Sequence, residues 1–358
     1  MKVGILNFHR ALNYGAVLQC YGLQEVLKEM GHEVVVLDYR PYCIEKTRFF
    51  FNTNYIKQGR FFLFLKSFIA SILSLPNNIK AHRSFNRFLK EHINLSNDII
   101  TFKNLNLLDD YDIIFVGSDQ VWSERITQLD PVYLGDFPRK KVKYVSYAAS
   151  LGSSSYFNDP KQKQLIHYLK NYSNISVRED YLKDWLNEHN IDSKVTLDPS
   201  LLADATIYNY IANTTIKKDY VLLIDLHGIN SAYNFAQKIS SQLDCELYTL
   251  KASGWSRRSN DIIGVSPSMY LGLIKNAKCI ITSSFHATAF SISFRKDFYA
   301  LQCDADGRYR TLLNSLDLGS RLIDSSSNMK FNSIDYSGIE KRQQYLKDSS
   351  MSYISGCF

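Results

Sequence analysis

The amino-acid sequence predicts two α/β domains that face each other across a cleft. At 358 residues the chain is longer than an ordinary single domain of about 100–200 residues. Hydrophobic residues make up 45% of the chain and charged residues 22%, which is the balance of a globular protein. Short apolar runs also alternate with helical patterns in both halves, and this alternation builds parallel sheets.

The first domain opens with a strand, a helix and a second strand. The pattern predicts a strand at residues 3–7, a helix over about 16–30 and a strand at 34–38. Two further buried strands are expected at residues 112–116 and 142–149. Loops at the carboxyl ends of such strands are where open α/β sheets bind ligands.

The second half of the chain restarts the alternation after a polar stretch near residues 213–218. Ser266 and Pro267 form a typical helix start, with a capping side chain followed by a proline in the first turn. The expected elements are a strand at 220–225, a helix from about 231, a strand at 246–250, a helix at 266–277 and a strand at 279–282.

These patterns divide the chain into three parts. We expect a first domain of residues 1–213, a second domain of residues 214–325 and a tail of residues 326–358. A helical pattern at about 339–349 predicts that the tail carries a helix, and we expect it to pack back on the first domain.

A basic amphipathic helix is expected as an insertion in the first domain, over about residues 54–75. Lys57 and Arg60 recur at helical spacing beside a run of phenylalanine, leucine and isoleucine residues. Two interpretations stay open. The apolar face covers the first domain, or the helix lies on an anionic bilayer.

The charge balance indicates the class of partner. Lys and Arg number 42 against 35 Asp and Glu, an excess that favours phosphorylated ligands or an anionic membrane surface over nucleic acid.

The six cysteines form no CxxC pair and have no histidine at metal-ligand spacing, so we expect reduced thiols and no metal site. The first residues lack the pattern of an export signal, and no run of about 18 uncharged apolar residues is present. We therefore expect a cytoplasmic protein, with peripheral contact at the inner face of the membrane if the basic helix binds lipid.

Polar residues follow the first predicted strand, and we assign Arg10, Asn13 and Gly15 to substrate binding. Gly15 frees the backbone just before a helix, whose N-terminus favours anions or sugar hydroxyls. Glycine turns of this kind are also common where no ligand binds.

The loop after residues 112–116 contains Ser118, Asp119 and Trp122. Short polar side chains suit hydrogen bonds to a sugar, Trp122 offers a ring for stacking on it, and Asp119 is a candidate base. Alternatively, Ser118 or Asp119 caps a helix and Trp122 lies in the core.

Two further strand ends carry residues suited to acid–base chemistry and anion binding. Arg178 follows a short strand and presents a guanidinium shaped for a phosphate or carboxylate, unless it only pairs with Glu179. His286 follows a buried strand, and an imidazole can pass a proton in either direction near neutral pH. A histidine satisfied inside the core is the alternative. Arg308 and Arg310 follow a later strand and form a candidate anion clamp.

Taken together, these segments resemble the polysaccharide pyruvyl transferase family over roughly residues 2–325. The matching stretches, in order, are FHRALNYGAVLQCYGLQ, YDIIFVGSDQVW, VSYAASLG, ISVRED with LDPSLL, and SPSMYLGLIKNAKCIITSSFHATAFSI. The resemblance implies a glycosyltransferase-B-like pair of Rossmann domains. It also implies transfer of a pyruvyl group from phosphoenolpyruvate to two sugar hydroxyls, which leaves a cyclic ketal.

The resemblance assigns roles by motif. His286 occupies the position of the family's catalytic histidine, and Arg178 matches the arginine of its SVRE-like segment. Several members have an arginine two residues before the histidine, where this chain has Ser284. We expect Arg308 and Arg310 to supply that charge, with Ser283 and Ser284 donating hydrogen bonds.

The expected co-substrate is phosphoenolpyruvate, with no other cofactor. The expected acceptor is galactose or an N-acetylhexosamine in a lipid-linked repeat unit of a bacterial capsule or exopolysaccharide. Two alternatives remain: a sugar-nucleotide glycosyltransferase of the same fold, and a relative that acts in polysaccharide assembly without catalysis.

Overall fold

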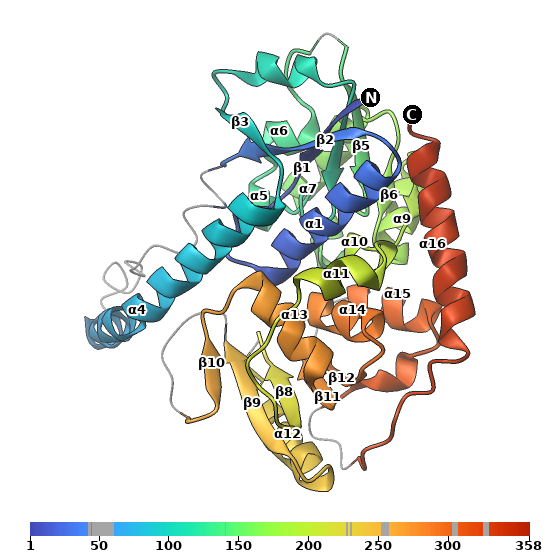
Figure 1. The fold of residues 1–358 in the computed structure, drawn as a ribbon. Helices are drawn as coiled ribbons and strands as arrows, with labels where there is room; N and C mark the ends of the chain where they lie inside the picture. The colour runs from blue at the N-terminus through green and yellow to red at the C-terminus, as the bar shows by residue number, and fades with distance from the viewer. Residues whose placement is uncertain are drawn as a thin grey trace.

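Two parallel β-sheets form the body of the protein in the computed structural model (Figure 1). The structure describes residues 1–41, 44, 61–139, 141–226, 228–229, 231–251, 258–302, 307–324 and 329–358. The predicted fold class is confirmed, because both sheets are parallel and helices connect their strands.

The first sheet has the strand order β3-β2-β1-β4-β5. The elements of this half are β1 (Lys2–Leu6), α1 (Tyr14–Glu29), β2 (Glu33–Tyr39), α4 (Phe61–His92), β3 (Leu95–Ile100), η2 (Leu105–Asp110), β4 (Ile113–Gly117), α5 (Glu124–Thr127), α6 (Pro131–Leu134), β5 (Lys143–Tyr147), η3 (Ser154–Asn158), α7 (Pro160–Lys163), α8 (Leu165–Leu169), β6 (Ser176–Val177), α9 (Asp180–Glu188), β7 (Lys194–Val195), α10 (Pro199–Leu202) and α11 (Ala205–Ile211).

The second sheet has the order β10-β9-β8-β11-β12-β13. Its half contains β8 (Tyr220–Ile224), α12 (Ala232–Gln242), β9 (Glu246–Lys251), β10 (Asp261–Ile263), α13 (Pro267–Asn276), β11 (Cys279–Thr282), α14 (Phe285–Ser293), β12 (Asp297–Leu301), α15 (Gly307–Ser315), η4 (Gly319–Arg321) and β13 (Leu322–Ile323), and the tail contains α16 (Ile339–Ser355).

The central strands are buried on both faces. Every residue of β4, β8 and β11 is buried, as expected for parallel strands covered by helices on each side. Gly117, the last residue of β4, has a φ of +121°, and a Cβ there would meet the carbonyl oxygen of Tyr147 at 2.4 Å. Only glycine fits this turn without strain, so the loop after β4 begins at a fixed point.

Helix caps set the positions of the helices that approach the middle of the molecule. Asn13 caps α1 by accepting hydrogen bonds from the backbone of Gly15 and Ala16. The cap explains why α1 begins two residues before the predicted start. Ser266 caps α13 with Pro267 in its first turn, as the sequence indicates.

The two halves share one apolar core through α1, α10, α11, α13 and α14. The rings of Tyr14 and Tyr270 stack across the two halves, with centroids 4.5 Å apart. Tyr208 packs on Tyr21 of the first half and on Phe290 of the second. Because this packing continues from one sheet to the other, the facing strand ends are held close together.

The tail helix α16 lies against the first half of the chain (Figure 1). The hydroxyl of Tyr353 donates to the carbonyl of Ser146 at 2.8 Å, and Lys143 Nζ donates to the carbonyl of Cys357 at 2.9 Å. The ring of Phe358 stacks on His32. These contacts fasten the C-terminus beside β5, next to the strands that lead to the candidate site.

The inserted helix differs from the prediction. Residues 54–60 of the predicted helix lie outside the described part of the chain. From Phe61, α4 continues to His92, well past the predicted end at residue 75. Pro76 is the sequence signal for a stop, but here it lies inside the helix. The second half of α4 packs Phe85, Phe88 and Leu89 into the core, and this packing holds the helix together beyond the proline.

Four strands were not predicted: β3, β7, β10 and β13. They lie at or near sheet edges, and β3 exposes most of its residues, so it lacks the apolar run that marks a buried strand. Among the described cysteines, Cys20, Cys245, Cys279 and Cys357 are free thiols. The described helices include none that is long and apolar enough to cross a membrane.

Candidate active site

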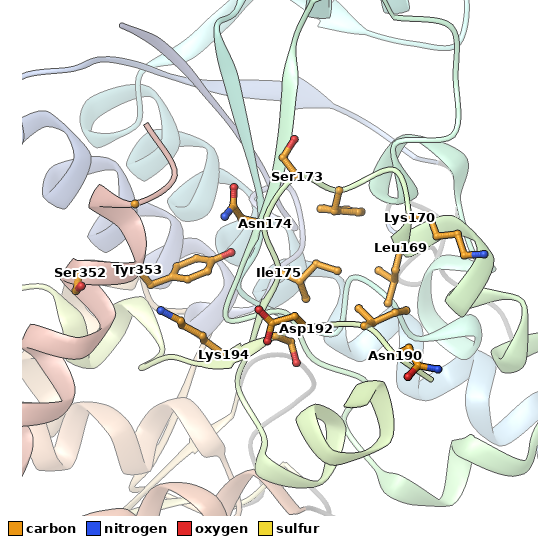
Figure 2. Close-up of a pocket in the computed structure, with 14 residues that line it drawn as sticks. Leu169, Lys170, Ser173, Asn174, Ile175, Asn190, Asp192, Lys194, Ser352 and Tyr353 are labelled. Atoms are coloured by element: carbon orange, nitrogen blue, oxygen red, sulfur yellow. The ribbon is translucent and has the colours of Figure 1, made fainter. Parts of the chain in front are cut away.

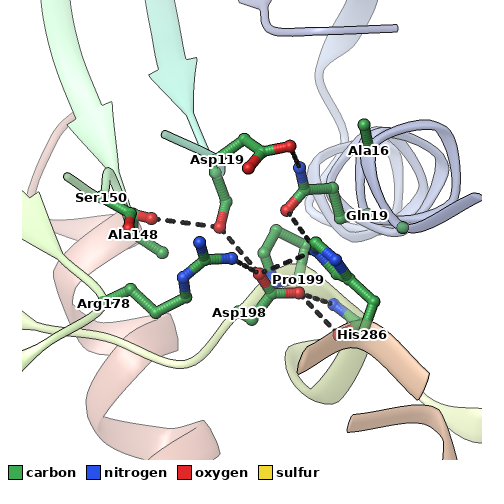
Figure 3. A network of polar contacts seen from close by, with 12 residues as sticks. Ala16, Gln19, Asp119, Ala148, Ser150, Arg178, Asp198, Pro199 and His286 are labelled. Atoms are coloured by element: carbon green, nitrogen blue, oxygen red, sulfur yellow. Dashed lines mark hydrogen bonds and ion pairs between the residues drawn. The ribbon is translucent and has the colours of Figure 1, made fainter. Parts of the chain in front are cut away.

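Asp198 is the centre of a buried polar network between the two halves (Figure 3). It follows β7 and caps the short helix α10, where its Oδ1 accepts hydrogen bonds from the backbone and hydroxyl of Ser200. Its Oδ2 accepts from Arg178 Nη1 at 2.8 Å and from the Ser118 hydroxyl at 3.0 Å. The carboxylate therefore joins the ends of β4, β6 and β7.

Arg178 is a buried guanidinium with unused donors. It ends β6, pairs with Asp198, and lies over the ring of Phe285 at 4.5 Å from the ring centroid. Its Nε and Nη2 atoms are buried and have no hydrogen-bond partner, although Nε lies 3.6 Å from Glu179 Oε1 in an ion pair, so Nη2 is the nitrogen left without a partner. Buried donors of a charged group are costly when unpaired, so this arrangement is suited to an anion that would complete it.

His286 lies in the first turn of α14, where the chain leaves the second sheet. Its Nε2 is 3.3 Å from Gln19 Oε1 and 3.7 Å from Asp198 Oδ2. The imidazole packs directly on Gly15, where an added Cβ would lie 2.1 Å from its Nδ1 atom. Gly15 thus has no side chain because the imidazole of the opposite half occupies that space.

The side-chain amide of Gln19 links His286 to Asp119. Its amide Nε2 donates to Asp119 Oδ2 at 3.3 Å, so its Oε1 faces the imidazole. An amide oxygen only accepts, and His286 therefore carries a proton on Nε2 when neutral. The second oxygen of Asp119 accepts from the backbone of Gln120. All three side chains are buried.

Burial lowers the pKa of His286 below its ordinary value of 6.5. The carboxylates of Asp198 and Asp119 act in the opposite direction, while Arg178 and Arg308 lower the pKa further. In the free protein the imidazole is neutral near pH 7.

Burial by itself would raise the pKa of Asp198, but the charged form of His286, Arg178 and the hydrogen bonds from Ser200 outweigh it and lower the pKa. Because His286 is neutral near pH 7, Arg178 is the partner whose charge keeps this carboxylate ionised there.

A cavity of about 160 Å³ opens beside this network. Arg178 and Asp198 line it from the first half, Phe285 and Arg308 from the second, and Ser350 from α16. The guanidinium of Arg308 lies 5.7 Å from the centroid of the Phe285 ring, which Arg178 also contacts. His286 is 6% exposed and does not line this cavity; its Nε2 lies 3.7 Å from Asp198 Oδ2, and Asp198 does line it. Two guanidinium groups thus line the cavity where the halves face each other, and the neutral imidazole contacts the Asp198 carboxylate that lies between it and the cavity.

Another cavity of about 490 Å³ lies between the segment around β6 and β7 and the last turns of α16 (Figure 2). Asp192, Lys194 and Tyr353 lie around it. None of the residues predicted to bind substrate lines it, and we do not assign it to the candidate site.

The structure places three predicted residues in roles other than ligand binding. Trp122 is wholly buried in the first core and its indole donates to the Tyr172 hydroxyl, so the expectation of an exposed stacking ring is wrong. Arg310 is exposed on α15 and does not line the cavity, in contrast to Arg308. Because an α-helix has about 3.6 residues per turn, the side chains of Arg308 and Arg310, two residues apart, point to different sides of the helix. Arg10 forms a bidentate ion pair with Asp38, in which its Nε and Nη2 atoms donate to the two carboxylate oxygens.

The other predicted residues support the backbone around the site. Asn13 is the α1 cap, and Ser284 caps α14 by accepting from the backbone of Ala287. Ser283 donates to Asp225 at the end of β8 and accepts from the backbone of Leu226. Ser118 is the exception, since its hydroxyl belongs to the Asp198 network.

Sequence reasoning missed Asp198, Gln19 and Phe285 as parts of the site. Asp198 precedes a proline, which is the usual signal of a helix cap, and capping alone explains that pattern. Gln19 is a lone amide in the apolar stretch of α1, and its full burial is the signal that a polar partner lies across the interface.

We expect Asp198→Asn to lower the free energy of unfolding by about 3–5 kcal/mol, because it leaves the buried Arg178 charge without its carboxylate. Urea unfolding monitored by circular dichroism measures the change. Asp219→Asn is the matched control, since Asp219 pairs with Lys278 at 2.8 Å on the surface, and it should change little. Equal losses for the two variants would contradict the buried network.

Comparison with known sequences and structures completes the description of the site. The sequence model of the family described as polysaccharide pyruvyl transferase matches residues 13–304. A search of curated proteins found no match. Among solved structures, a putative UDP-N-acetylglucosamine 2-epimerase from Listeria monocytogenes is 10% identical, with a TM-score of 0.49 over 99% of this chain and 89% of its own.

Two other solved structures show similar values. UDP-GlcNAc 2-epimerase from Neisseria meningitidis bound to UDP-GlcNAc is 10% identical, with a TM-score of 0.49 over 100% of this chain and 94% of its own. ADP-heptose LPS heptosyltransferase II from E. coli is 8% identical, with a TM-score of 0.40 over 99% of each chain. Nothing about substrate follows from similarity at this level. The family match spans most of the chain and includes the network residues from Gln19 to His286, and the protein belongs to the polysaccharide pyruvyl transferase family.

Proposed function

We propose that the protein transfers a pyruvyl group from phosphoenolpyruvate to two hydroxyls of one sugar and forms a cyclic ketal. The observation that carries this proposal is the buried guanidinium of Arg178, whose Nη2 has no partner, in the same network as the neutral imidazole of His286. The family membership supports it, since its members are described as polysaccharide pyruvyl transferases. The acceptor is galactose or an N-acetylhexosamine in a lipid-linked repeat unit of a capsule or exopolysaccharide.

The donor fits the size and charge of the cavity. Phosphoenolpyruvate carries a carboxylate and a phosphate, and Arg178 and Arg308 line the cavity from opposite halves, beside the carboxylates of Asp198 and Asp180. The cavity of about 160 Å³ is smaller than the roughly 300–1,000 Å³ that hold drug-sized ligands, so it suits a small donor better than a whole sugar nucleotide. The arginines supply the positive charge, and no cofactor other than the donor is proposed.

The serine at position 284 does not remove the cationic character of the site. Ser284 caps α14, and the positive charge comes instead from Arg178 and Arg308, whose guanidinium groups lie 4.5 Å and 5.7 Å from the centroid of the Phe285 ring. The N-terminal end of α14 adds a partial positive charge at the same place. These features support catalysis over a purely structural role in polysaccharide assembly.

A single histidine can supply the proton that the reaction requires and then recover one from the sugar. The charged imidazole of His286 donates a proton to C3 of the donor, and C2 becomes electrophilic. A sugar hydroxyl then forms the first C2–O bond and gives its proton to the now neutral imidazole. The second hydroxyl forms the other C2–O bond as the bond from C2 to the phosphate oxygen breaks, and its proton leaves with the phosphate. Asp119 is a second candidate base beside the same imidazole.

Donor binding switches the protonation of His286 in this scheme. In the free protein burial keeps the imidazole neutral. A bound anion next to it stabilises the charged form and raises its pKa, so the imidazole takes up a proton when the donor arrives.

The activity is tested by incubating the protein with phosphoenolpyruvate and a panel of synthetic and lipid-linked glycosides. We expect mass spectrometry to show the mass increase of a pyruvyl ketal and a phosphate assay to show equal release of phosphate. Stabilisation by nucleoside diphosphates, with no phosphate released from phosphoenolpyruvate, would favour a sugar-nucleotide glycosyltransferase and contradict the proposal.

We expect Arg308→Gln to weaken phosphoenolpyruvate binding by about 10–100-fold, because it removes one of two charge-assisted contacts to the anion. Arg310→Gln is the matched control on the same helix, since Arg310 does not line the cavity, and its affinity should stay within about twofold. Titration calorimetry with phosphoenolpyruvate gives both values. The donor site is misplaced if the two variants lose affinity equally.

Phosphoenolpyruvate binding near pH 7.5 should take up a proton at His286, whose pKa lies below 6.5 in the free protein and rises in the complex. At this pH the donor phosphate is already doubly charged, because its second pKa is about 6. Calorimetry in buffers of different ionisation enthalpy should show a buffer-dependent heat, and affinity should fall as pH rises. His286→Gln should abolish the buffer dependence. If the buffer dependence persists in that variant, His286 is not the group that takes up the proton.

A further inference from the structure

The positive charge of this protein is concentrated around α4. From Lys46 to Lys90 the chain contains nine Lys or Arg residues and no Asp or Glu. The remaining residues carry 33 Lys or Arg against 35 Asp or Glu. The excess positive charge of the whole chain therefore comes from this one stretch, and the described part of α4 includes Lys80, Arg83, Arg87 and Lys90 of it.

The first half of α4 exposes large apolar side chains. Ile69, Ile72 and Leu73 are 51%, 53% and 51% exposed, and Ile79 is 41% exposed. In the second half Phe85, Phe88 and Leu89 are buried against the body of the protein. Figure 1 shows the first half of α4 projecting away from both sheets. These apolar side chains remain exposed to water, and exposed apolar patches of this kind mark contact sites.

The exposed apolar residues and the basic residues occupy one face of the helix. Steps of three or four residues lead from Ile69 through Ile72 and Pro76 to Lys80, Arg83, Arg87 and Lys90. The buried residues Phe85, Phe88 and Leu89 lie on the opposite face. The outward face is therefore apolar over its outer part and basic over its inner part, each about 15 Å long at 1.5 Å per residue. At its inner end Lys80 and Arg87 also line an open groove of about 380 Å³ between α4 and the start of α13.

We propose that this outward face of α4 docks the protein on an anionic lipid bilayer. The apolar outer part, Ile69, Ile72 and Leu73, enters the boundary between headgroups and acyl chains. The basic inner part, Lys80, Arg83 and Arg87, contacts the lipid phosphates. The order of apolar and basic residues along the helix matches the order of acyl chains and headgroups across a leaflet.

Charge decides between a bilayer and a second copy of this chain as the occupant. A second copy would bring the same excess of cations to the contact, since Glu91, one turn after Arg87, is the only carboxylate within α4. An anionic surface supplies the opposite charge to every basic residue of the row. The docking requires neither phosphoenolpyruvate nor a sugar, so it can be tested independently of the proposed reaction.

The full-length protein is tested by sedimentation with vesicles of phosphatidylglycerol and phosphatidylcholine, compared with vesicles of phosphatidylcholine alone. Binding should require the anionic lipid and weaken as salt is added. Equal binding to both vesicle types, or none to either, overturns the proposal.

Substitutions test each part of the face. The triple change Lys80→Gln, Arg83→Gln and Arg87→Gln should weaken vesicle binding by about 100-fold. The matched control removes three exposed lysines elsewhere, with Lys103→Gln, Lys217→Gln and Lys341→Gln, and should stay within about threefold. Comparable losses in the two triple variants would show only a dependence on net charge and would overturn the assignment to α4.

The apolar part is tested in the same assay. The double change Ile72→Ser and Leu73→Ser should weaken binding by at least about tenfold. The matched control is Ile99→Ser with Phe102→Ser, at residues 44% and 61% exposed near the edge strand β3, and it should bind as the unchanged protein does. Light scattering without vesicles gives the mass in solution. A dimer that the α4 double change splits, with vesicle binding unaffected, assigns the face to a second copy and overturns the bilayer.

Discussion

The buried pair of Arg178 and Asp198 is the interaction on which the centre of this protein depends. A guanidinium taken out of water needs a carboxylate, and a buried carboxylate needs donors on both oxygens. Asp198 meets this demand by joining Arg178, the Ser118 hydroxyl and Ser200. The pair leaves Nη2 of Arg178 without a partner, while Nε lies 3.6 Å from Glu179 Oε1, so the network that stabilises the fold also leaves one donor for an anion.

The second half of the chain contributes its reactive group through close packing rather than through an ion pair. His286 can reach Gln19 because Gly15 leaves room for the ring against the first turn of α1. Gln19 then relays the contact to Asp119 in the loop after β4. A neutral amide between an imidazole and a carboxylate holds both in place without adding charge. The pKa of the imidazole is therefore left to burial and the nearby charges, which is what makes it sensitive to a bound anion.

Local patterns were enough to predict the α/β class and most buried elements. Strand β11 occupies the predicted residues 279–282, and α13 begins one residue inside its predicted range, because an apolar run and a Ser-Pro cap are local signals. The end of α4 was predicted wrongly at residue 75, since the packing that carries the helix beyond Pro76 comes from residues distant in sequence. Edge strands such as β3 gave no signal, because exposure removes the apolar pattern.

The candidate site was predictable in its residue types and less so in its geometry. Arg178, His286 and Asp119 were singled out from strand ends and from the family resemblance, and the structure brings them into one network. Trp122 was misplaced because a ring suited to stacking is equally suited to a core, and sequence does not show which side of a loop faces inward. Asp198 was missed because a capping aspartate and a buried counter-ion look alike in sequence.

The central claim is that the unpaired Nη2 of Arg178 holds the donor beside His286. A crystal structure of the protein with phosphoenolpyruvate tests it most directly. The account predicts a carboxylate or phosphate oxygen within hydrogen-bond distance of Arg178 Nη2, with the donor bordering the imidazole of His286. Density for the donor at another surface, with Nη2 of Arg178 still unpaired, would contradict it.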